Sequence, residues 1–449
     1  MTPPRAPGPP TKRAAILFLT VFAKQEQSYF LDMQLCYLSG ALRALGQDND
    51  IAEAYLRRDL SAADRTYNQA LLARVREAII EGAYDKVYVL RAWGPELLEA
   101  LRPSAPELLP YEAFDEADLR SRWRAQRARP SELAPEPDAL QEILRAEPNL
   151  DVRTLNEDFR PAREWLALFG DEGCVYRRDL RKAPALEGCE LPDDGSVSLR
   201  GCAFCEVSKG APRRSVARIL PSLELQLTRL RRLRPAARDL VLIDQAPFAY
   251  LPRLVSHVAS LDFAPGVTLH LQTRVDVLLA QRSRLEESLR LARDVGIRLS
   301  PYLIGVENFS DRELEILHKG ITARQNEALL QLLDDLAGRY PDTLATEDLS
   351  FGFILWTPWT RMEDLRLNLA ALRRVRMTRF RGDEILTKLR LSPRVALFHK
   401  ARAEGLLVDR WPHDFLSNAQ RYGYEEESPW RFHDGQVGAA AELVFSEYE

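Results

Sequence analysis

Cysteine is the residue type whose spacing most directly suggests chemistry in this sequence. Cys202 and Cys205 are separated by two residues, within the segment GCAFC. Two thiolates at this spacing can bind one metal centre from a single loop, and a third thiolate would leave one iron of a [4Fe–4S] cluster open. Twelve residues separate Cys189 from Cys202, and twenty-seven separate Cys174 from it. Either can supply the third thiolate, and Cys189 is slightly favoured because a shorter loop costs less to close.

Two other interpretations of these cysteines stay open, and a third is disfavoured. A structural zinc site would use all four of Cys174, Cys189, Cys202 and Cys205 and would leave no open position. A thioredoxin-like dithiol would need only two of them. A disulfide scaffold would be unusual in a chain of 449 residues, whereas clustered cysteines in a reducing compartment more often bind metal.

Length and composition indicate a globular protein of two or three domains. The sequence is 46% hydrophobic and 29% charged, with a net charge of −4 and mixed signs along the chain. This balance argues against a dedicated nucleic-acid binder, which would show a concentrated basic face. The apolar run 14–23 follows two basic residues but lacks a small-residue cleavage site and is too short to span a bilayer. We therefore expect a cytoplasmic protein without a membrane partner.

The first 100 residues predict a doubly wound, flavodoxin-like α/β domain. Apolar runs typical of strands cover 15–22, 50–55 and 86–90, and helical periodicity fills the two intervals between them. No G-x-G-x-x-G follows the first strand, so the dinucleotide fingerprint is absent from this sequence. Residues 101–185 are rich in Pro, Ala, Glu and Arg and predict a linker with short helices.

Residues 186–400 predict a partial (β/α) barrel, followed by a C-terminal extension over 401–449. Strand patterns alternate with helical ones throughout the region; the strands are expected at 196–199, 240–243, 267–272, 299–306 and 349–355. Sustained alternation of this kind favours a barrel or part of one. Functional residues are then expected at the C-terminal ends of the strands.

The order of several motifs in this region resembles the radical S-adenosylmethionine (SAM) superfamily. The segments IGVENFSDREL (304–314) and LHKGIT (317–322) are similar to a strand ending in I-G-I-E-S and a following K-G-I-T. TRVD (273–276) looks like the family's T-R-x-D turn, and GFILWTPWT (352–360) stands where G-x-P-G-E-T is usual. The likeness covers about 190–410, and the α/β domain expected before it resembles the arrangement of the branch with an N-terminal cobalamin-binding-like domain. It departs from the family in the cluster loop, because no cysteine stands four residues before Cys202.

The resemblance implies a [4Fe–4S] cluster and SAM as cofactors. Cys202, Cys205 and one upstream cysteine would hold three irons, and the fourth would bind SAM and cleave it reductively to give a 5′-deoxyadenosyl radical. Glu307 would contact the ribose or amino group of SAM, and Phe204 would pack near the adenine. Asp244 and Arg274 would line the pocket. An electron donor such as flavodoxin or ferredoxin is implied, while the substrate and the catalytic residues that touch it are not identified.

Each of these residues also has a purely structural interpretation. Glu307 can be an acid favoured by a helix N-terminus, and Asp244 and Arg274 can be structural ion-pair partners. Cobalamin is a second question, because its usual D-x-H-x-x-G loop needs a histidine. Every histidine of the chain lies beyond residue 250: His257, His270, His318, His399, His413 and His433. We therefore favour a first domain that is a relic or binds without that ligand. The alternatives to a radical SAM enzyme are a cobalamin-assisted methyltransferase of the same superfamily and a zinc-stapled scaffold.

Overall fold

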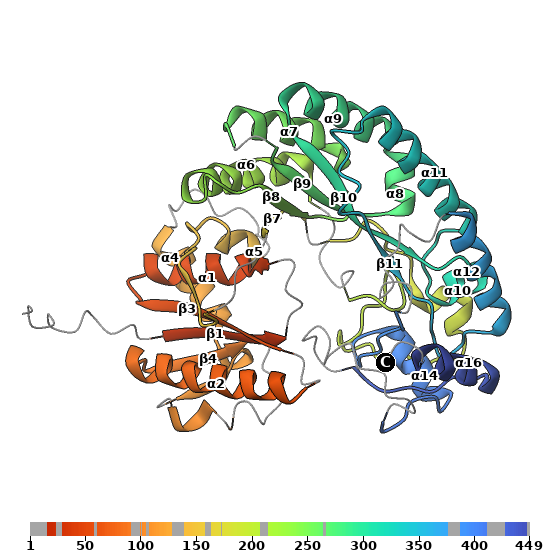
Figure 1. The fold of residues 1–449 in the computed structure, drawn as a ribbon, viewed down its shortest axis with the longest axis horizontal. Coiled ribbons are helices and arrows are strands. Elements are labelled where there is room, and N and C mark those ends of the chain that lie inside the picture. The colour runs from red at the N-terminus through yellow and green to blue at the C-terminus, as the bar shows by residue number, and fades with distance from the viewer. Residues whose placement is uncertain are drawn as a thin grey trace, which may run out of the picture. The chain divides into compact units, whose positions relative to one another are not determined.

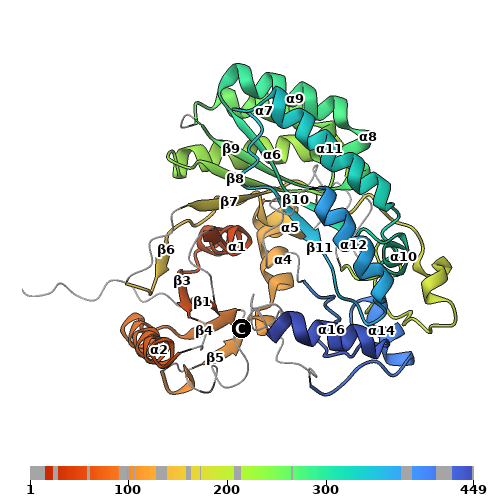
Figure 2. The ribbon, with the colours of Figure 1, turned by 45° about the vertical axis from the view of Figure 1, so that its right-hand side comes forward.

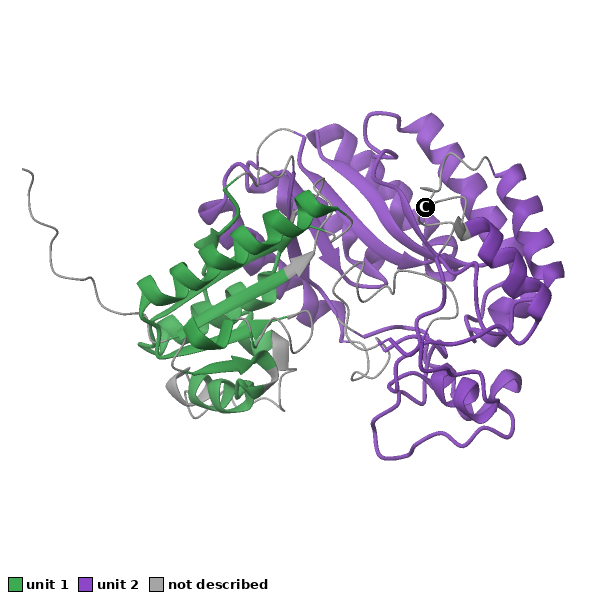
Figure 3. Cartoon of the chain, turned by 60° about the horizontal axis from the view of Figure 1, so that its bottom comes forward, with its two compact units in different colours: residues 1–162, 417–425 green, residues 163–416, 426–449 purple. Residues whose placement is uncertain are grey.

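The protein consists of two compact units, which are described separately. A computed structural model describes residues 16–23, 29–57, 61–90, 99, 101–104, 107–127, 139–157, 163–171, 173–206, 214–263, 266–375, 387–410 and 427–446. The first unit comprises residues 1–162 and 417–425, and the second comprises 163–416 and 426–449 (Figure 3). Among the described residues, no helix combines the length and apolar content that crossing a bilayer would require.

A parallel sheet forms the centre of the first unit. Its strands are β1 (Ile16–Ala23), β3 (Asn49–Leu56), β4 (Lys86–Leu90), β5 (Leu108–Pro110) and β6 (Val152–Thr154). They lie in the order β5–β4–β1–β3–β6, and β1 pairs with both β3 and β4 in parallel. The run β3–β1–β4–β5 is the flavodoxin-like order, and the last strand, β6, lies beside β3 instead of continuing beyond β5. The predicted doubly wound domain is therefore confirmed.

Helices cover both faces of this sheet because both faces are apolar. α2 (Ala62–Gly82) packs Leu71, Val75 and Ile79 against the strands. On the opposite face lie α1 (Met33–Ala44), which follows the short strand β2 (Tyr29–Leu31), and α4 (Glu116–Arg127) and α5 (Ala139–Ile143), which contact it (Figure 1). The first unit extends beyond the predicted limit of residue 100, since β5 and β6 lie in the region expected to be a linker. Both strands are three residues long, too short to show a hydrophobic period.

The second unit is built on β7 (Glu164–Phe169), β8 (Asp239–Ile243), β9 (Thr268–Arg274), β10 (Arg298–Glu307) and β11 (Ser350–Phe353). These strands lie in the order β11–β10–β9–β8–β7, and each neighbouring pair is parallel. β7 and β11 are separated by the three other strands and do not pair with each other in the described residues, so the strands form the predicted partial barrel and not a closed one.

Helices of the second unit lie on one side of these strands in both views (Figures 1 and 2). The longer ones are α6 (Val216–Leu233), α7 (Leu251–Ser260), α9 (Arg282–Val295), α11 (Ala323–Arg339) and α12 (Met362–Arg374). The short helices α8 (Val275–Ala280) and α10 (Asp311–Ile316) follow β9 and β10 directly. Near the C-terminus, α14 (Ala396–Ala403) and α16 (Gly435–Ser446) contribute to a further core together with Trp430.

The first strand of the barrel differs from the prediction. Residues 196–199 do not form a strand, and their neighbourhood has only an isolated bridge between Asp179 and Arg200. The first strand is instead β7, whose run Trp-Leu-Ala-Leu-Phe lies in the region predicted as a linker. A parallel strand covered on both faces requires such a continuous apolar run, and the four residues 196–199 do not offer one.

An ion cluster around Arg163, the residue before β7, joins it to Asp239 at the start of β8 and to Asp348 before β11. The guanidinium of Arg163 donates to both oxygens of Asp239 and to Asp348, with Nη1 at 2.6 Å from Asp348 Oδ1. His270 Nε2 on β9 lies 2.8 Å from Asp239 Oδ1. Burial alone would raise the pKa of Asp239, but hydrogen bonds from His270 and Arg163 outweigh burial and lower it to about 2. The carboxylate therefore stays charged and holds the strand starts in register.

Replacing Arg163 with Met should destabilise the second unit, because it leaves Asp239 and Asp348 without their shared cation. Removing one partner of a buried ion pair costs about 3–5 kcal/mol, and the 35% exposure of the Arg163 side chain reduces our expectation to about 2 kcal/mol. Urea unfolding followed by circular dichroism measures this loss. Arg284→Met, which removes an exposed pair with Glu287, is the matched control and should change stability by less than about 0.5 kcal/mol. Equal losses in the two variants would contradict the assigned role of Arg163.

Candidate functional site

A long loop after β7 carries most of the cysteines. Gly170 directly follows β7, and an added Cβ there would lie 2.7 Å from Tyr250 Oη and 2.9 Å from Asp244 Oδ2. Glycine therefore allows the end of β7 to approach the turn after β8 closely. Further along, the amide of Gly201 donates to the carbonyl of Arg178 at 2.9 Å. This contact lays the end of the loop beside its beginning.

Three of the cysteines gather where the two ends of the loop meet. Cys174, Cys202 and Tyr176 form a small buried cluster, and Phe204 and Cys205 pack against it. The amide of Cys205 donates to the carbonyl of Cys202 at 3.3 Å, which closes a turn between the two thiols. All five cysteines of the chain are free thiols. The site thus combines one cysteine near the end of β7 with two from the C-x-x-C segment.

Cys189, which we slightly favoured as the third ligand, lies elsewhere. It packs against the core that contains α14 residues such as Leu397. Burial raises the pKa of its thiol, and the charged groups that act on it are led by Lys400 of α14 and include the adjacent Glu190. The shorter loop of Cys189 does not decide between the two cysteines, because the amide of Leu180 donates to the carbonyl of Leu199 at 3.0 Å. That pairing brings the far end of the longer loop back to Cys174.

The thiols are not arranged around a single ion. Within the described part of the chain, no group of three or more His, Cys, Asp or Glu side chains forms a site for one metal ion. Thiolates that hold a [4Fe–4S] cluster each bind a different iron, so they stand farther apart than the ligands of one zinc ion. Two buried thiols and one partly buried thiol, without a carboxylate or imidazole in their cluster, are a donor set suited to a [4Fe–4S] cluster.

Arg274 connects the end of β9 to the cysteine loop. Its Nη1 donates to Cys202 Sγ at 3.3 Å, and its Nη2 donates to the carbonyl of Lys319 at 2.6 Å. Its Nε donates to Asp276 Oδ1 at 2.9 Å, and the guanidinium lies 4.3 Å from the ring centroid of Tyr176. The side chain is 3% exposed. Arg274 therefore both forms an ion pair and touches a predicted metal ligand.

Glu307 ends β10 in a conformation that few glutamates adopt. Its φ is 64°, in the left-handed region where a non-glycine residue is strained and where functional residues are over-represented. Its Oε1 lies 2.6 Å from Lys319 Nζ, and both side chains are buried. Burial alone would lower the pKa of Lys319, but Glu307 and Cys202 raise it, so the lysine stays charged. An added Cβ at Gly305 would lie 2.5 Å from Lys319 Nζ, so only glycine leaves room for this pair.

The remaining predicted residues fall in different environments. Phe204 is partly buried, and Lys319 Nζ lies 5.7 Å from its ring centroid, so the ring borders both the thiols and the Glu307–Lys319 pair. Asp244 is 1% exposed, and its oxygens accept from Tyr250 Oη at 2.6 Å and the Ala246 amide at 2.7 Å. Those bonds stabilise the turn after β8.

Two residues of the site were not predicted. Lys319 stood inside the K-G-I-T segment, which was recognised as a motif without a role for its lysine. Tyr176 follows Cys174 by two residues, and no pattern in a single sequence marks it. Its Oη is buried without a hydrogen-bond partner among the described residues, and its ring packs against Gly320, where an added Cβ would lie 2.5 Å away.

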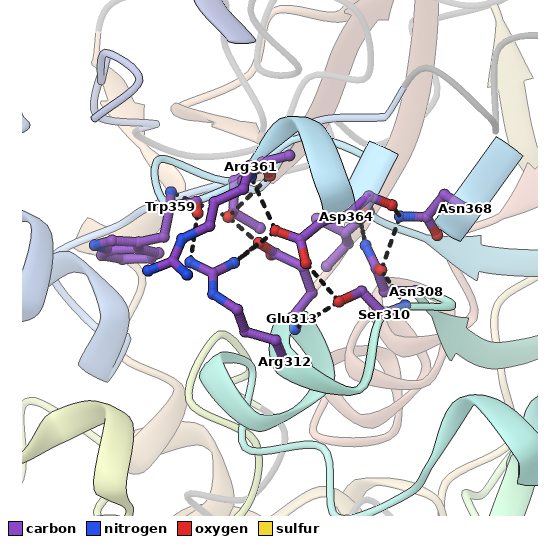
Figure 4. A network of polar contacts seen from close by, with 11 residues as sticks. Asn308, Ser310, Arg312, Glu313, Trp359, Arg361, Asp364 and Asn368 are labelled. Carbon is purple, nitrogen blue, oxygen red and sulfur yellow. Dashed lines mark hydrogen bonds and ion pairs between the residues drawn. The ribbon is translucent and has the colours of Figure 1, made fainter. Parts of the chain in front are cut away.

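A polar network supports the segment that follows Glu307 (Figure 4). Asn308 Oδ1 accepts from Asn368 Nδ2 at 2.9 Å and from the Ser310 amide at 2.8 Å. Asp364 accepts from Ser310 Oγ at 2.6 Å and from Arg312 Nη1 at 2.6 Å. These bonds link the β10–α10 turn to α12 and fix the backbone directly after Glu307. In the superfamily motif a serine stands at position 308, and here the asparagine has a structural role.

A buried carboxyl group lies at the edge of this network. Glu313 accepts from Thr357 Oγ1 at 2.9 Å and from Arg312 Nη1 at 3.1 Å. Burial, reinforced by the neighbouring charge of Asp364, raises the pKa of Glu313 to about 7. A cavity of about 850 Å³ opens beside the network and is lined in part by Trp359. A second, of about 250 Å³, is lined by Tyr176 and so borders the cysteine site.

Comparison with known proteins shows where this fold occurs. No protein-family model and no curated protein sequence matches the chain. Solved structures of the cobalamin-dependent SAM radical enzyme OxsB match 95% of the chain. The form with aqua-cobalamin and SAM bound has 15% identity and a TM-score of 0.52. The apo form has 14% identity and a TM-score of 0.58, and the form with aqua-cobalamin alone has 13% identity and a TM-score of 0.56.

The chain has the fold of OxsB. It spans 65–66% of the length of those chains, so OxsB contains further residues that have no counterpart here. At this level of identity, the likeness establishes the architecture of both units and the order of their elements. The chemistry must be argued from the residues of this chain.

Gly320→Ala should loosen the packing between Tyr176 and the segment after α10. Gly320 has a φ of 71°, and an added Cβ would lie 2.5 Å from the Tyr176 ring, so the variant combines backbone strain with a clash. We expect a loss of roughly 2 kcal/mol, measured by thermal unfolding. Gly338→Ala in α11 is the control, because nothing lies within 4 Å of its added Cβ. This control should be neutral or stabilising by up to about 1 kcal/mol, and a larger loss there than at Gly320 would contradict the packing described.

Glu313→Gln should remove a pH dependence of stability. The unfolded carboxyl titrates near 4.5 and the folded one near 7, so its contribution is complete below about pH 4.5 and is lost as the pH rises to about 7. The expected decrease over this range is roughly 3 kcal/mol. Urea unfolding at pH 5 and pH 7.5 should show a smaller difference in the variant than in the wild type. Glu315→Gln, on the exposed face of α10, should leave the difference unchanged, and an unaltered slope in Glu313→Gln would contradict the assignment.

Proposed function

We propose that this protein is a radical SAM enzyme in which Cys174, Cys202 and Cys205 hold a [4Fe–4S] cluster. The observation that carries the proposal is the meeting of these three thiols beside the ends of β9 and β10. Three chain ligands leave one iron of the cluster without a protein ligand, which is the requirement for binding SAM. The fold shared with SAM-bound OxsB supports the proposal.

When bound, such a cluster supplies one electron to SAM and so starts radical chemistry on a substrate. The chain itself holds and desolvates the thiols, since Cys174 and Cys202 are less than a tenth exposed. Glu307 is proposed to bind the ribose or amino group of SAM. Its Oε1 is held by Lys319, while its Oε2 accepts no hydrogen bond from a described residue. Phe204, beside the thiols, is proposed to pack against the adenine.

Lys319 has a supporting role in this proposal. A carboxylate buried without a cation would take up a proton and lose its value as an acceptor. Lys319 supplies that cation to Glu307 and fixes one of its oxygens. An electron donor such as flavodoxin or ferredoxin is the proposed redox partner, and the cytoplasm is the proposed location.

Cobalamin is not among the cofactors that we propose for this protein. The order of the first unit's sheet suits a nucleotide-like or corrinoid cofactor at the switch point beside β1, and OxsB was solved with aqua-cobalamin. No histidine of this chain precedes residue 257, so none in residues 1–162 can replace the lower ligand of cobalt. The loops that follow β1, β3 and β4 lie partly outside the described residues. A radical SAM enzyme without imidazole-ligated cobalamin is therefore our proposal.

Anaerobic reconstitution with iron and sulfide tests the ligand set. Wild-type protein should take up about four irons and four sulfides per chain, measured by metal analysis and visible absorption. Cys174→Ala, Cys202→Ala and Cys205→Ala should each lose the cluster, because none of the other thiols lies at the site. Cys189→Ala is the matched control and should retain it. Zinc in place of iron would favour the scaffold, and loss of the cluster in Cys189→Ala with retention in Cys174→Ala would contradict the assigned ligands.

A further inference from the structure

We infer that Arg274 is a positioning residue that sets the reduction potential of the cluster through its hydrogen bond to Cys202. The inference rests on the proposed function, since it concerns the same three thiols. The inference goes beyond the proposed function because it gives Arg274 a role different from that of the residues that would bind SAM. The sequence suggested only that Arg274 lines a pocket or forms an ion pair.

The geometry leaves Arg274 little freedom to do anything else. Its three nitrogens are directed at three different acceptors: Cys202 Sγ, the Lys319 carbonyl and the Asp276 carboxylate. One face of the guanidinium lies over the ring of Tyr176 at 4.3 Å. The Arg274 side chain is 3% exposed, and each of its nitrogens already has an acceptor. It is therefore held against the Cys202 thiol and is not available to bind a cofactor directly.

The positive charge of Arg274 favours the reduced state of a cluster bound to the Cys202 thiolate. A cluster held by three thiolates becomes more negative when it accepts an electron, and a nearby cation stabilises the added charge. A hydrogen bond to a ligating sulfur acts in the same direction, because it withdraws electron density from the metal. The low exposure of Arg274 and Cys202 limits screening by water, so the effect of the charge is large.

Tyr176 and Asp276 tune this effect. The Tyr176 ring covers the guanidinium and keeps water from it, whereas Asp276 neutralises part of its charge from a position that is 32% exposed. Arginine suits the site better than lysine, because its planar fork can satisfy three acceptors in fixed directions. Lysine would keep the charge but could not maintain all three contacts.

The test is a redox titration of the reconstituted protein, followed by the EPR signal of the reduced cluster. In Arg274→Met, reduction should become at least about tenfold less favourable, which corresponds to a midpoint about 59 mV more negative for one electron. The midpoint potential of Arg274→Lys should lie between that of Arg274→Met and that of the wild type. Arg178→Met is the matched control, because Arg178 is exposed, lies 5.8 Å from the Tyr176 ring and carries the same charge. Its midpoint should equal that of the wild type.

The outcomes separate this inference from the proposed function. Wild-type protein that takes up no iron would overturn the proposed function. A cluster in Arg274→Met with the wild-type midpoint would overturn the inference alone, as would equal shifts in Arg274→Met and Arg178→Met. If Arg274→Met assembles no cluster, Arg274→Gln, which keeps N–H donors without the charge, takes its place. Loss of the cluster from both variants would make Arg274 a structural residue and would also overturn the inference.

Discussion

Two buried cations, Arg274 and Lys319, join the cysteine loop to the ends of neighbouring barrel strands. Arg274 binds the sulfur of Cys202 and the carbonyl of Lys319, and Lys319 binds Glu307. Removing such charges from water is costly unless each finds a partner. The thiols, the carboxylates and the carbonyl at this site supply those partners, so the loop after β7 and the turns after β9 and β10 are held together by one set of contacts.

Small residues and backbone strain around this set make it possible. Gly305 leaves room for the Glu307–Lys319 pair, and Gly320 for the ring of Tyr176. Glu307 itself has a left-handed backbone, which the network of Asn308 and its neighbours holds in place (Figure 4). The site is thus built from features that are individually unfavourable, and the surrounding packing stabilises them. That pattern is expected where geometry matters more than stability.

The sequence predicted the architecture well where elements are long and regular. The barrel strands from β8 to β11 fall close to their predicted limits, because apolar runs recur there and alternate with helical periodicity. The short edge strands β5 and β6 and the first barrel strand β7 were not predicted. Three residues cannot show a period, and β7 lies in a segment whose overall composition resembles a linker.

The sequence predicted which residue types form the site, but it did not predict which of those residues come together. The C-x-x-C spacing identified Cys202 and Cys205, while the preference for Cys189 over Cys174 followed chain distance and overlooked the backbone pairing of Leu180 with Leu199. The role of Lys319 depends on a tertiary contact with Glu307 that no local sequence pattern predicts.

The most direct test of the central claim is the EPR spectrum of the reconstituted, reduced protein with and without SAM. An open iron predicts a [4Fe–4S]⁺ signal that shifts when SAM is added. A signal indifferent to SAM would contradict the account.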